Sequence, residues 1–128
     1  MIRIIDPDEV YLFWEVAKPQ LDKAFEDCLY DTADLHYENL VTAKEQLWQV
    51  NDNTWAITRI VDSNVGRVFH HVAFGGSNIE NNIHDFVSMA EEIARLSGCK
   101  KVFVVGRKGW MKYLPDYKLT RITLEKEL

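Results

Sequence analysis

Apolar positions change their spacing in the second half of the chain, and the change predicts a strand followed by a helix. Over Val68–Phe74 both alternating sets of positions are largely apolar, which is typical of a strand covered on both faces. Gly75 and Gly76 then allow positive φ, and residues 77–80 have the Ser-x-x-Glu spacing of a capping box. We therefore expect a helix to begin near Asn78.

This helix is expected to pack one face on a sheet and to lead into a second strand. Its apolar residues recur at three- and four-residue steps, at Ile79, Ile83, Phe86, Val87, Ala90, Ile93 and Ala94. Gly98 stands where a left-handed C-terminal cap belongs, and the apolar run within 101–105 predicts a short strand. A right-handed crossover joins parallel strands, so the strands at 68–74 and 101–105 are predicted to be parallel neighbours.

The N-terminal part is predicted to be helical. Residues 6–9, Asp-Pro-Asp-Glu, supply an N-cap, a proline at the first helical position and early acidic residues, so a helix is expected through 10–17. Pro19 is expected to break or kink this helix, with a continuation to about residue 29. A further helix, capped near residues 31–32, is expected to carry Leu35, Leu40 and Val41.

Antiparallel strands are predicted between the helical part and the crossover. Residues 47–50 and 54–61 form a hairpin pattern around an Asn-Asp-Asn turn, and a second turn leads into the strand at Val68. After the crossover, residues 106–114 are expected to form a short helix. A final strand is expected over 117–125, where Leu119, Ile122 and Leu124 are spaced among polar residues.

The composition is that of a soluble globular protein, and it argues against membranes and nucleic acids as partners. The 128 residues are 47% hydrophobic with a formal net charge of −5, and no apolar run is long enough to cross a bilayer. We expect one domain over residues 1–128 and no membrane association. The acidic balance argues against binding nucleic acid through a general electrostatic field. A local anion site stays open, because one basic patch is expected from Lys100, Lys101, Arg107, Lys108 and Lys112.

The two cysteines indicate a reducing compartment. Cys28 and Cys99 are far apart in the sequence, belong to no C-x-x-C motif and follow no signal peptide. We therefore expect reduced thiols and a cytoplasmic protein. Neither cysteine is predicted to be catalytic, and no spacing of ligand residues indicates a metal site.

The predicted order of elements resembles the GCN5-related N-acetyltransferase (GNAT) family. The similarity is clearest near the C-terminus, in Gly-Arg-Lys-Gly-Trp at 106–110, Leu114, Tyr117 and the closing residues 124–128, which resemble small acetyltransferase-like proteins encoded by bacteriophages. The resemblance implies an α/β (α+β) fold with a mixed central sheet. In this family the strands corresponding to 68–74 and 101–105 splay apart and open a V-shaped cleft for the pantetheine arm of acetyl-CoA.

The same resemblance implies that the turn after Val68–Phe74 holds the pyrophosphate of acetyl-CoA. The cofactor-binding residues would be Phe74, Gly75, Gly76, Ser77 and Asn78, together with Arg107. The turn is shorter than the family's usual loop, which reads Arg or Gln, two residues, Gly, one residue, then Gly or Ala. A helix N-terminus still offers N–H groups to phosphate, yet the Gly-Gly pair also fits a tight strand-to-helix turn, and both interpretations stay open.

Acyl transfer to an amine needs a base for the attacking nitrogen and an acid for the leaving thiolate. Tyr113 is the candidate acid, because it lies close to where the family places a tyrosine, although a packing role explains it as well. His70 and His71 point to opposite faces of a strand, so only one of them can face the cleft. His71 is the candidate base, with a packed histidine as the alternative.

A run of acidic residues lies on the predicted N-terminal helices, which in the family shape the acceptor side of the cleft. The run consists of Asp22, Glu26, Asp27, Asp31, Asp34 and Glu38. These carboxylates can attract a cationic amine, and they equally fit a solvated helix surface.

Two functions of different class follow. The first is an acyl-CoA-dependent N-acyltransferase acting on a small-molecule or protein amine. The second is a catalytically inactive GNAT-like phage protein that serves as a virion component or binds a host protein, with Arg107, Lys108 and Trp110 as the surface to test. The family resemblance favours the first, whereas the shortened turn and the absence of a clear base favour the second.

Overall fold

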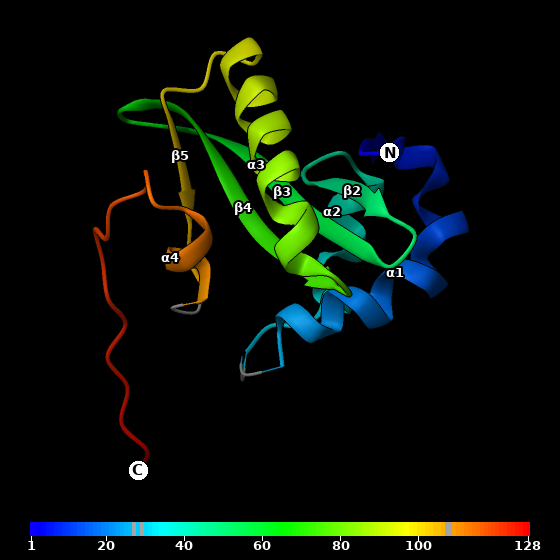
Figure 1. The fold of residues 1–128 in the computed structure, drawn as a ribbon, viewed down its shortest axis with the longest axis horizontal. Coiled ribbons are helices and arrows are strands. Elements are labelled where there is room, and N and C mark those ends of the chain that lie inside the picture. Colours follow the sequence, from blue (N-terminus) through cyan, green and yellow to red (C-terminus); the bar gives the residue numbers. More distant parts are fainter. Residues whose placement is uncertain (27, 29, 107–108) are drawn as a thin grey trace.

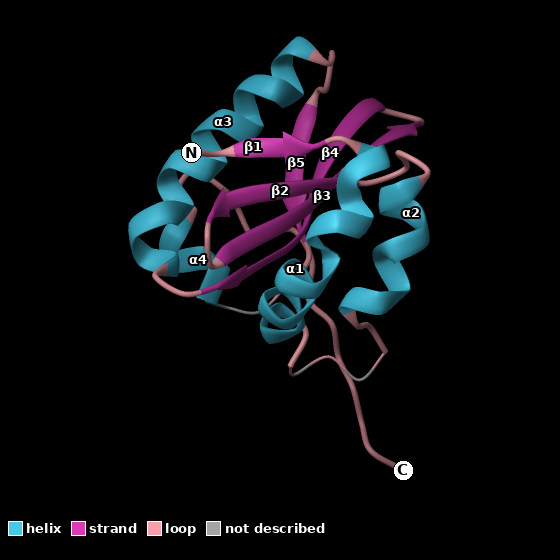
Figure 2. Cartoon of the chain, turned by 90° about the vertical axis from the view of Figure 1, so that its right-hand side faces the viewer, coloured by secondary structure: helices cyan, strands magenta, loops and turns pink. Residues whose placement is uncertain are grey.

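The protein is a three-layer structure in which helices cover both faces of one sheet (Figures 1 and 2). The computed structural model describes residues 1–26, 28, 30–106 and 109–128. Within these residues the sheet has five strands in the order β1-β2-β3-β4-β5. The elements are β1 (Arg3–Ile5), η1 (Pro7–Glu9), α1 (Val10–Ala24), η2 (Ala33–His36), α2 (Tyr37–Val41), β2 (Gln46–Asn51), β3 (Thr54–Ser63), β4 (Gly66–Gly76), α3 (Ile79–Leu96), β5 (Lys101–Val104) and α4 (Gly109–Tyr113).

The sheet is mixed, as predicted. Strands β1 to β4 pair antiparallel in sequence order, and β4 pairs parallel with β5 from Val68 opposite Lys101 to His71 opposite Val104. The predicted hairpin and the predicted parallel crossover through α3 are therefore confirmed.

The N-terminus differs from the prediction in two ways. The short strand β1 was not expected; it adds to β2 and buries Ile5. Pro19, predicted to break or kink the helix, does not break it, because α1 continues through it; the helix ends at Ala24 rather than near residue 29. Proline removes one backbone donor from a helix, and burial of Ala17 and Leu21 on both sides of it holds the helix on the sheet.

Two apolar cores lie on opposite faces of the sheet. The α1-face core is formed by Ile5, Val10, Ala17, Leu21, Ala33, Leu40, Leu47, Trp55, Ile57 and Ala73. The α3-face core is formed by Trp48, Val50, Ala56, Phe69, Phe74, Ile83, Phe86, Ala90 and Ala94. Alternation along β2 and β3 sends Leu47 and Trp55 to one core and Trp48 and Ala56 to the other, as expected of strands covered on both faces.

Helix α3 begins near Asn78 and ends before Gly98, as predicted, but its N-terminal cap differs from the prediction. Gly98 has φ +79°, and its N–H and that of Cys99 donate to the carbonyls of Arg95 and Ala94, which is a left-handed C-terminal cap. The predicted capping box is wrong: Asn78 is the N-cap, in the left-handed region at φ 55°, without a side-chain cap bond. Glu80 instead contacts residues of α4, as described below.

The predicted final strand over 117–125 is also wrong. In the described C-terminal segment the chain after α4 forms no strand, and beyond Tyr117 it extends away from the sheet (Figures 1 and 2). Leu119, Ile122 and Leu124 are 67%, 72% and 86% exposed. A strand requires backbone hydrogen bonds to a neighbouring strand, and this segment pairs with none of the five described strands.

Candidate functional site

Strands β4 and β5 diverge at a β-bulge formed by Val72. His71 and Ala73 face consecutive residues of β3, so Val72 is an extra residue on β4. Pairing with β5 ends at His71 and Val104, whereas β4 continues to Gly76, and the two strands spread apart from that point (Figure 1). A bulge bends its strand and strengthens the local twist. We call the point where the two strands part, at His71 of β4 and Val104 of β5, the vertex of the divergence, and the bulge lies directly beyond it.

The bulge also changes which side chains share a face. Val72 and Ala73 both pack against the α1-face core, while Phe69 and Phe74 lie in the α3-face core together with the His71 ring. Strict alternation would place Phe74 opposite His71. Because the extra residue shifts the alternation by one, the two residues instead share the α3 face directly beyond the vertex.

His71, the predicted base, is the buried polar group at this vertex. Its ring is 1% exposed and is surrounded by Phe69, Phe86, Trp110 and Tyr117. Among the described residues neither ring nitrogen has a hydrogen-bond partner. Burial, and then the charge of His70, lowers the pKa of His71 to about 4, so the ring is neutral at pH 7. A neutral imidazole without a partner keeps a nitrogen lone pair that can accept a hydrogen bond or a proton from a bound group.

His70 faces the opposite side of the sheet. The Nε–H of Arg59 donates to its Nδ1 at 3.0 Å, and its ring stacks on Phe103 of β5 at 4.4 Å. Burial and the Arg59 charge lower the pKa of His70 to about 4. The structure thus separates the two histidines as the strand pattern predicts, with one on each face of the sheet at the last residues paired to β5.

A buried polar network continues from Arg59 across the α1 face. Nη1 of Arg59 lies 3.8 Å from Oε2 of Glu45, whose Oε1 is 2.7 Å from Nδ1 of His36. Nε2 of His36 is 2.9 Å from Oδ1 of Asp31. Burial lowers the pKa of His36, but its hydrogen bonds to Glu45 and Asp31 outweigh burial and raise the pKa overall. No sequence motif indicates this network, because its members are scattered from Asp31, which precedes η2, to His70 on β4.

The turn after β4 is fixed by close backbone contacts. A Cβ on Gly75 would lie 2.3 Å from the carbonyl oxygen of Gln20, and one on Gly76, which has φ +140°, would lie 2.0 Å from that of Asn53. The predicted positive φ is thus found at Gly76. The Ser77 N–H donates to the Asn53 carbonyl at 3.1 Å. In the turn predicted to bind phosphate, both glycines therefore pack against backbone atoms. The Ser77 N–H is already hydrogen-bonded to Asn53.

The start of α3 lies next to α4. Lys112 Nζ and Tyr113 Oη each lie 3.4 Å from Oε1 of Glu80 in the first turn of α3. Contacts with Tyr113 and then with Glu80 raise the pKa of Lys112, so this amine stays charged. Tyr113, the predicted acid, thus lies beside the free N–H groups of the α3 N-terminus. Lys112 is the basic residue that the structure brings to the turn; Arg107, predicted for that role, lies outside the described residues.

Trp110 connects α4 to the vertex. Its ring centroid is 6.0 Å from that of His71 and 6.3 Å from that of Phe74. Gly106 allows this approach, because a Cβ there would lie 2.8 Å from the indole. His71 and Tyr113 are therefore on the same side of the sheet, because Trp110, which lies beside His71, and Tyr113 both pack against the α3-face core.

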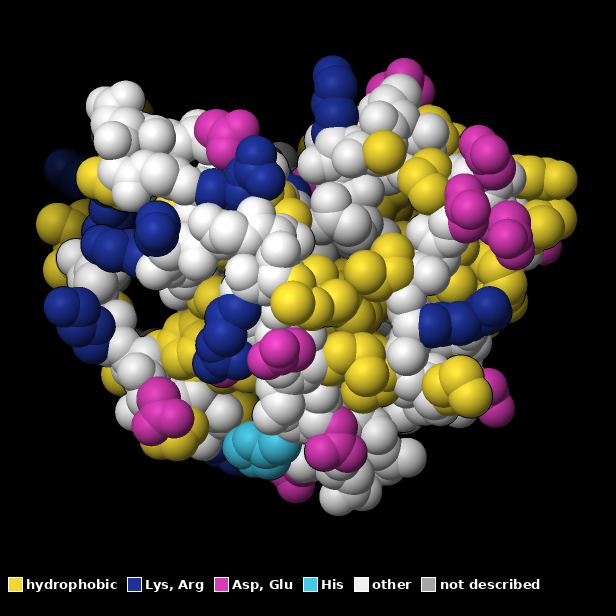
Figure 3. Space-filling view, turned by 90° about the horizontal axis from the view of Figure 1, so that it is seen from above, with side chains coloured by type: hydrophobic (Ala, Val, Ile, Leu, Met, Phe, Trp, Pro, Cys, Tyr) yellow, Lys and Arg dark blue, Asp and Glu magenta, His cyan; other side chains and the backbone are white. Residues whose placement is uncertain are grey.

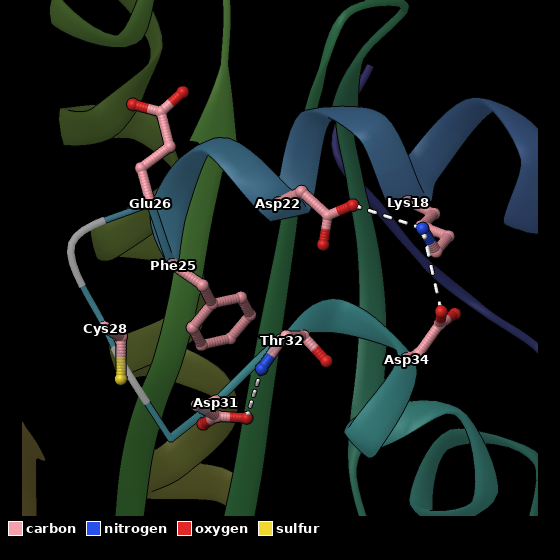
Figure 4. A pocket seen from close by; sticks show the side chains of 8 residues that line it. All are labelled: Lys18, Asp22, Phe25, Glu26, Cys28, Asp31, Thr32 and Asp34. Atoms are coloured by element: carbon pink, nitrogen blue, oxygen red, sulfur yellow. Dashed lines mark hydrogen bonds and ion pairs between the residues drawn. The ribbon is translucent and has the colours of Figure 1, made fainter.

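An acidic hollow lies between the end of α1 and η2 (Figure 4). It has a volume of about 390 Å³ and is lined by Lys18, Asp22, Phe25, Glu26, Cys28, Asp31, Thr32 and Asp34. Lys18 pairs with Asp22 at 3.3 Å and with Asp34 at 3.6 Å. Four members of the acidic run noted in the sequence thus meet at one place, with a single lysine among them.

The expected single basic patch is wrong for the described residues. Lys101 faces Val68 near the start of β4, whereas Lys112 contacts Glu80 beyond the end of β4. Arg107 and Lys108 lie outside the described residues. From above, basic side chains are mixed with acidic and apolar ones rather than forming one continuous face (Figure 3).

Comparisons with solved structures identify the fold. The chain is similar to an aminoglycoside acetyltransferase from an uncultured soil metagenomic sample (TM-score 0.71, 9% identity, covering 100% of this chain and 95% of that one). It is also similar to a predicted acetyltransferase with acetyl-CoA from Clostridium acetobutylicum (0.66, 14%, 100% and 94%) and to a ribosomal-protein-alanine N-acetyltransferase from Brucella melitensis (0.66, 9%, 100% and 98%). No family model and no curated protein sequence matches. The fold is therefore that of the GNAT acetyltransferases, as the resemblance implied.

None of the helices in the described ranges is both long enough and apolar enough to cross a membrane.

Proposed function

We propose that this protein is an acyl-CoA-dependent N-acyltransferase that transfers an acetyl group to an amine in the cytoplasm. The observation that carries the proposal is the divergence of β4 and β5 at the Val72 bulge, with the unpartnered His71 at its vertex. Beyond the vertex, the β5-facing backbone groups of β4 have no strand partner in the described sheet. Such groups can bind the amides of an extended pantetheine arm in the way that a sheet edge binds a peptide.

The phosphates of CoA are proposed to bind at the start of α3. The N–H groups of Asn78, Ile79 and Glu80 belong to the helix N-terminus, which favours anions. Lys112 supplies a nearby cation, which a bound phosphate would share with Glu80. The contribution of the Gly75–Ser77 backbone is smaller than the resemblance implied, because the Ser77 N–H is already bonded to Asn53.

In the proposed reaction the amine nitrogen attacks the thioester carbonyl, the C–N bond forms, and the C–S bond breaks. His71 accepts the proton that the nitrogen loses, since its ring is neutral at pH 7. Tyr113 donates its phenolic proton to the departing thiolate of CoA. The acidic hollow of α1 and η2 is proposed to attract the cationic acceptor, because four carboxylates line it against one lysine.

The alternative is an inactive GNAT-like phage protein that acts as a virion component or binds a host protein. The packed Gly75-Gly76 turn and the engaged Ser77 N–H favour this alternative, because they leave fewer donors for a pyrophosphate than the family's longer loop. Trp110, with the undescribed Arg107 and Lys108, is the proposed partner surface in that case.

Calorimetry with acetyl-CoA and an assay of CoA thiol release with a panel of amines separate the two functions. The acyltransferase is expected to bind acetyl-CoA and to lose affinity in Lys112→Ala, while Lys118→Ala, in the exposed C-terminal segment, serves as the matched control. If acetyl-CoA does not bind and no amine releases thiol, the inactive alternative is correct. A pull-down with Trp110→Ala as the comparison then tests the partner surface.

A further inference from the structure

The space between the diverging ends of β4 and β5 holds the side chain of Trp110. The indole centroid lies 6.0 Å from that of the His71 ring and 6.3 Å from that of the Phe74 ring, so the indole lies beside β4 on both sides of the Val72 bulge. On its other side it packs against Gly106, which follows β5. Because α4 carries Trp110 just beyond the end of β5 (Figure 1), the indole spans the two strands directly past the vertex.

This arrangement keeps ligands away from His71. The side chain is 1% exposed, although neither ring nitrogen has a hydrogen-bond partner among the described residues. Phe69 and Phe86 enclose the ring from the core, and Trp110 and Tyr117 enclose it from the C-terminal part of the chain. The proton transfer proposed above requires direct contact or one bridging water. One of these covering side chains must therefore move before His71 can act.

Trp110 is the least firmly held of the four covering side chains. Phe69 and Phe86 are 1% and 0% exposed in the α3-face core, and the Tyr117 hydroxyl donates to Glu91 at 2.7 Å. Trp110 is only half-buried. Helix α4, which carries it, has five residues, and two exposed side-chain contacts of 3.4 Å connect this helix to α3. The indole can therefore turn toward solvent while the core stays packed.

We propose that Trp110 is a built-in cover of the candidate site. In the free protein its indole occupies the opening between β4 and β5, and it must swing outward before a ligand reaches His71. The inference rests on the proposed function for the identity of that ligand, an acyl-CoA, whereas the cover itself follows from packing alone. A cover of this kind lowers the apparent affinity, because the ligand binds only those molecules in which the opening is free.

Gly106 allows a sharp test, because the indole packs directly on it. A Cβ at Gly106 would lie 2.8 Å from Cδ1 and 2.9 Å from Nε1 of Trp110, so Gly106→Ala displaces the indole by adding one methyl group. The backbone of Gly106 does not have the positive φ that disfavours alanine. Gly109→Ala is the matched control, since a Cβ there would meet no atom within 4 Å.

Modification by diethyl pyrocarbonate at pH 7, located by tandem mass spectrometry, measures whether His71 can be reached. His71 should be protected in the wild type and in Gly109→Ala. It should react at least about tenfold faster in Gly106→Ala, because the rate follows the population of open molecules. The exposed His84 should react equally in all three proteins and serves as the internal standard. Trp110→Ala, which removes the indole, should also expose His71 and replaces Gly106→Ala if that variant does not fold.

Two results of this experiment would overturn the proposal. The first is a wild-type protein in which His71 reacts as fast as His84. The second is a folded Gly106→Ala or Trp110→Ala protein in which His71 stays as protected as in the wild type.

Calorimetry with acetyl-CoA separates the cover from the proposed function. Gly106→Ala should bind acetyl-CoA at least about tenfold more tightly than the wild type if the cover is closed in about nine tenths of the molecules or more, and Gly109→Ala should bind like the wild type. If no variant binds acetyl-CoA yet His71 becomes reactive in Gly106→Ala, the acyltransferase is contradicted and the cover is supported. Equal affinity of the wild type and Gly106→Ala for acetyl-CoA would overturn the cover, because the indole would then not compete with the ligand.

Discussion

His36 and Glu45 share a 2.7 Å hydrogen bond beneath the helices that cover the α1 face, and both side chains are buried. The same imidazole reaches Asp31 with its other nitrogen and stacks on Phe25 at 5.4 Å. Two further buried histidines, His70 and His71, lie on β4, and no carboxylate of the described residues is hydrogen-bonded to either. The surroundings of His36 thus favour its charged form, whereas those of His70 and His71 favour the neutral form. Protonation of His36 therefore stabilises the fold, and protonation of His70 and His71 destabilises it.

We predict a stability maximum near pH 6.5, the ordinary pKa of histidine. The raised pKa of His36 gives stability that is complete below pH 6.5 and is lost as the pH rises through its folded-state pKa. The lowered pKa values of His70 and His71, both about 4, give stability that is present above pH 6.5 and is lost as the pH falls toward 4. Each pKa unit corresponds to about 1.4 kcal/mol, so the acid limb should amount to several kcal/mol.

Urea unfolding between pH 4 and 9 measures this profile. In His36→Gln the loss of stability above pH 6.5 should flatten while the acid limb remains. A free energy of unfolding that does not change between pH 4 and 6.5 would contradict the buried, neutral state of the two β4 histidines.

A second prediction concerns His71 and separates function from stability. His71→Phe keeps a ring in the core and removes two buried nitrogens without partners, so the free energy of unfolding should rise by about 1 kcal/mol. If His71 is the base, turnover should fall at least about a hundredfold. His70→Phe is the matched control, because it breaks the bond from Arg59 and should destabilise the fold instead. Full thiol-release activity in folded His71→Phe would remove His71 from the mechanism.

A third prediction compares two tyrosines that each lose only a hydroxyl. Tyr113→Phe should reduce turnover by roughly a hundredfold with little change in Tm, since its hydroxyl makes a long 3.4 Å contact at the surface. Tyr117→Phe should instead lower Tm and leave turnover nearly unchanged. Burial and the hydrogen bond to Glu91 raise the pKa of Tyr117 and keep its hydroxyl protonated, so losing that bond should cost about 1 kcal/mol with turnover retained. Equal effects of both variants on Tm and turnover would contradict these roles.

A fourth prediction uses two glycines. Gly76→Ala should destabilise the protein by about 2 kcal/mol or more, because φ is +140° and the new Cβ would collide with the Asn53 carbonyl. Gly109→Ala, where no atom lies within 4 Å of the new Cβ, should be neutral or slightly stabilising in α4. Thermal unfolding of both variants checks the difference, and a Gly76→Ala protein as stable as wild type would show that this turn relaxes.

The elements recovered from the sequence are those defined by local spacing. The apolar steps of α3, Gly98 at its end and the hairpin turn before Thr54 are each set by neighbouring residues. Contacts made across the fold were not recoverable in this way. Pro19 stays in the helix because buried residues on both sides of it pack against the sheet. Glu80 contacts Lys112 and Tyr113 of α4 instead of capping α3.

The candidate site shows the same division. That His70 and His71 face opposite ways follows from strand geometry, and the structure agrees. The bulge at Val72 carries no composition signal, because valine fits a regular strand as well as an irregular one. The Asp31–His36–Glu45–Arg59 network depends on residues from separate elements, so no motif announces it. In the sequence Lys112 is one of several basic residues with nothing to distinguish it. Only the packing of α4 places it at the start of α3.

The extra residue at Val72 separates the positions that build the two cores from the position that opens the proposed cofactor cleft. Without it, His71, Ala73 and Phe74 would still alternate between the two faces, and both cores would keep their side chains. Removing Val72 would therefore leave the apolar pattern of the two cores unchanged. The divergence of β4 from β5, in contrast, begins at this residue. We therefore expect that deleting the codon for Val72 would close the proposed cofactor cleft between β4 and β5 without redesign of the core.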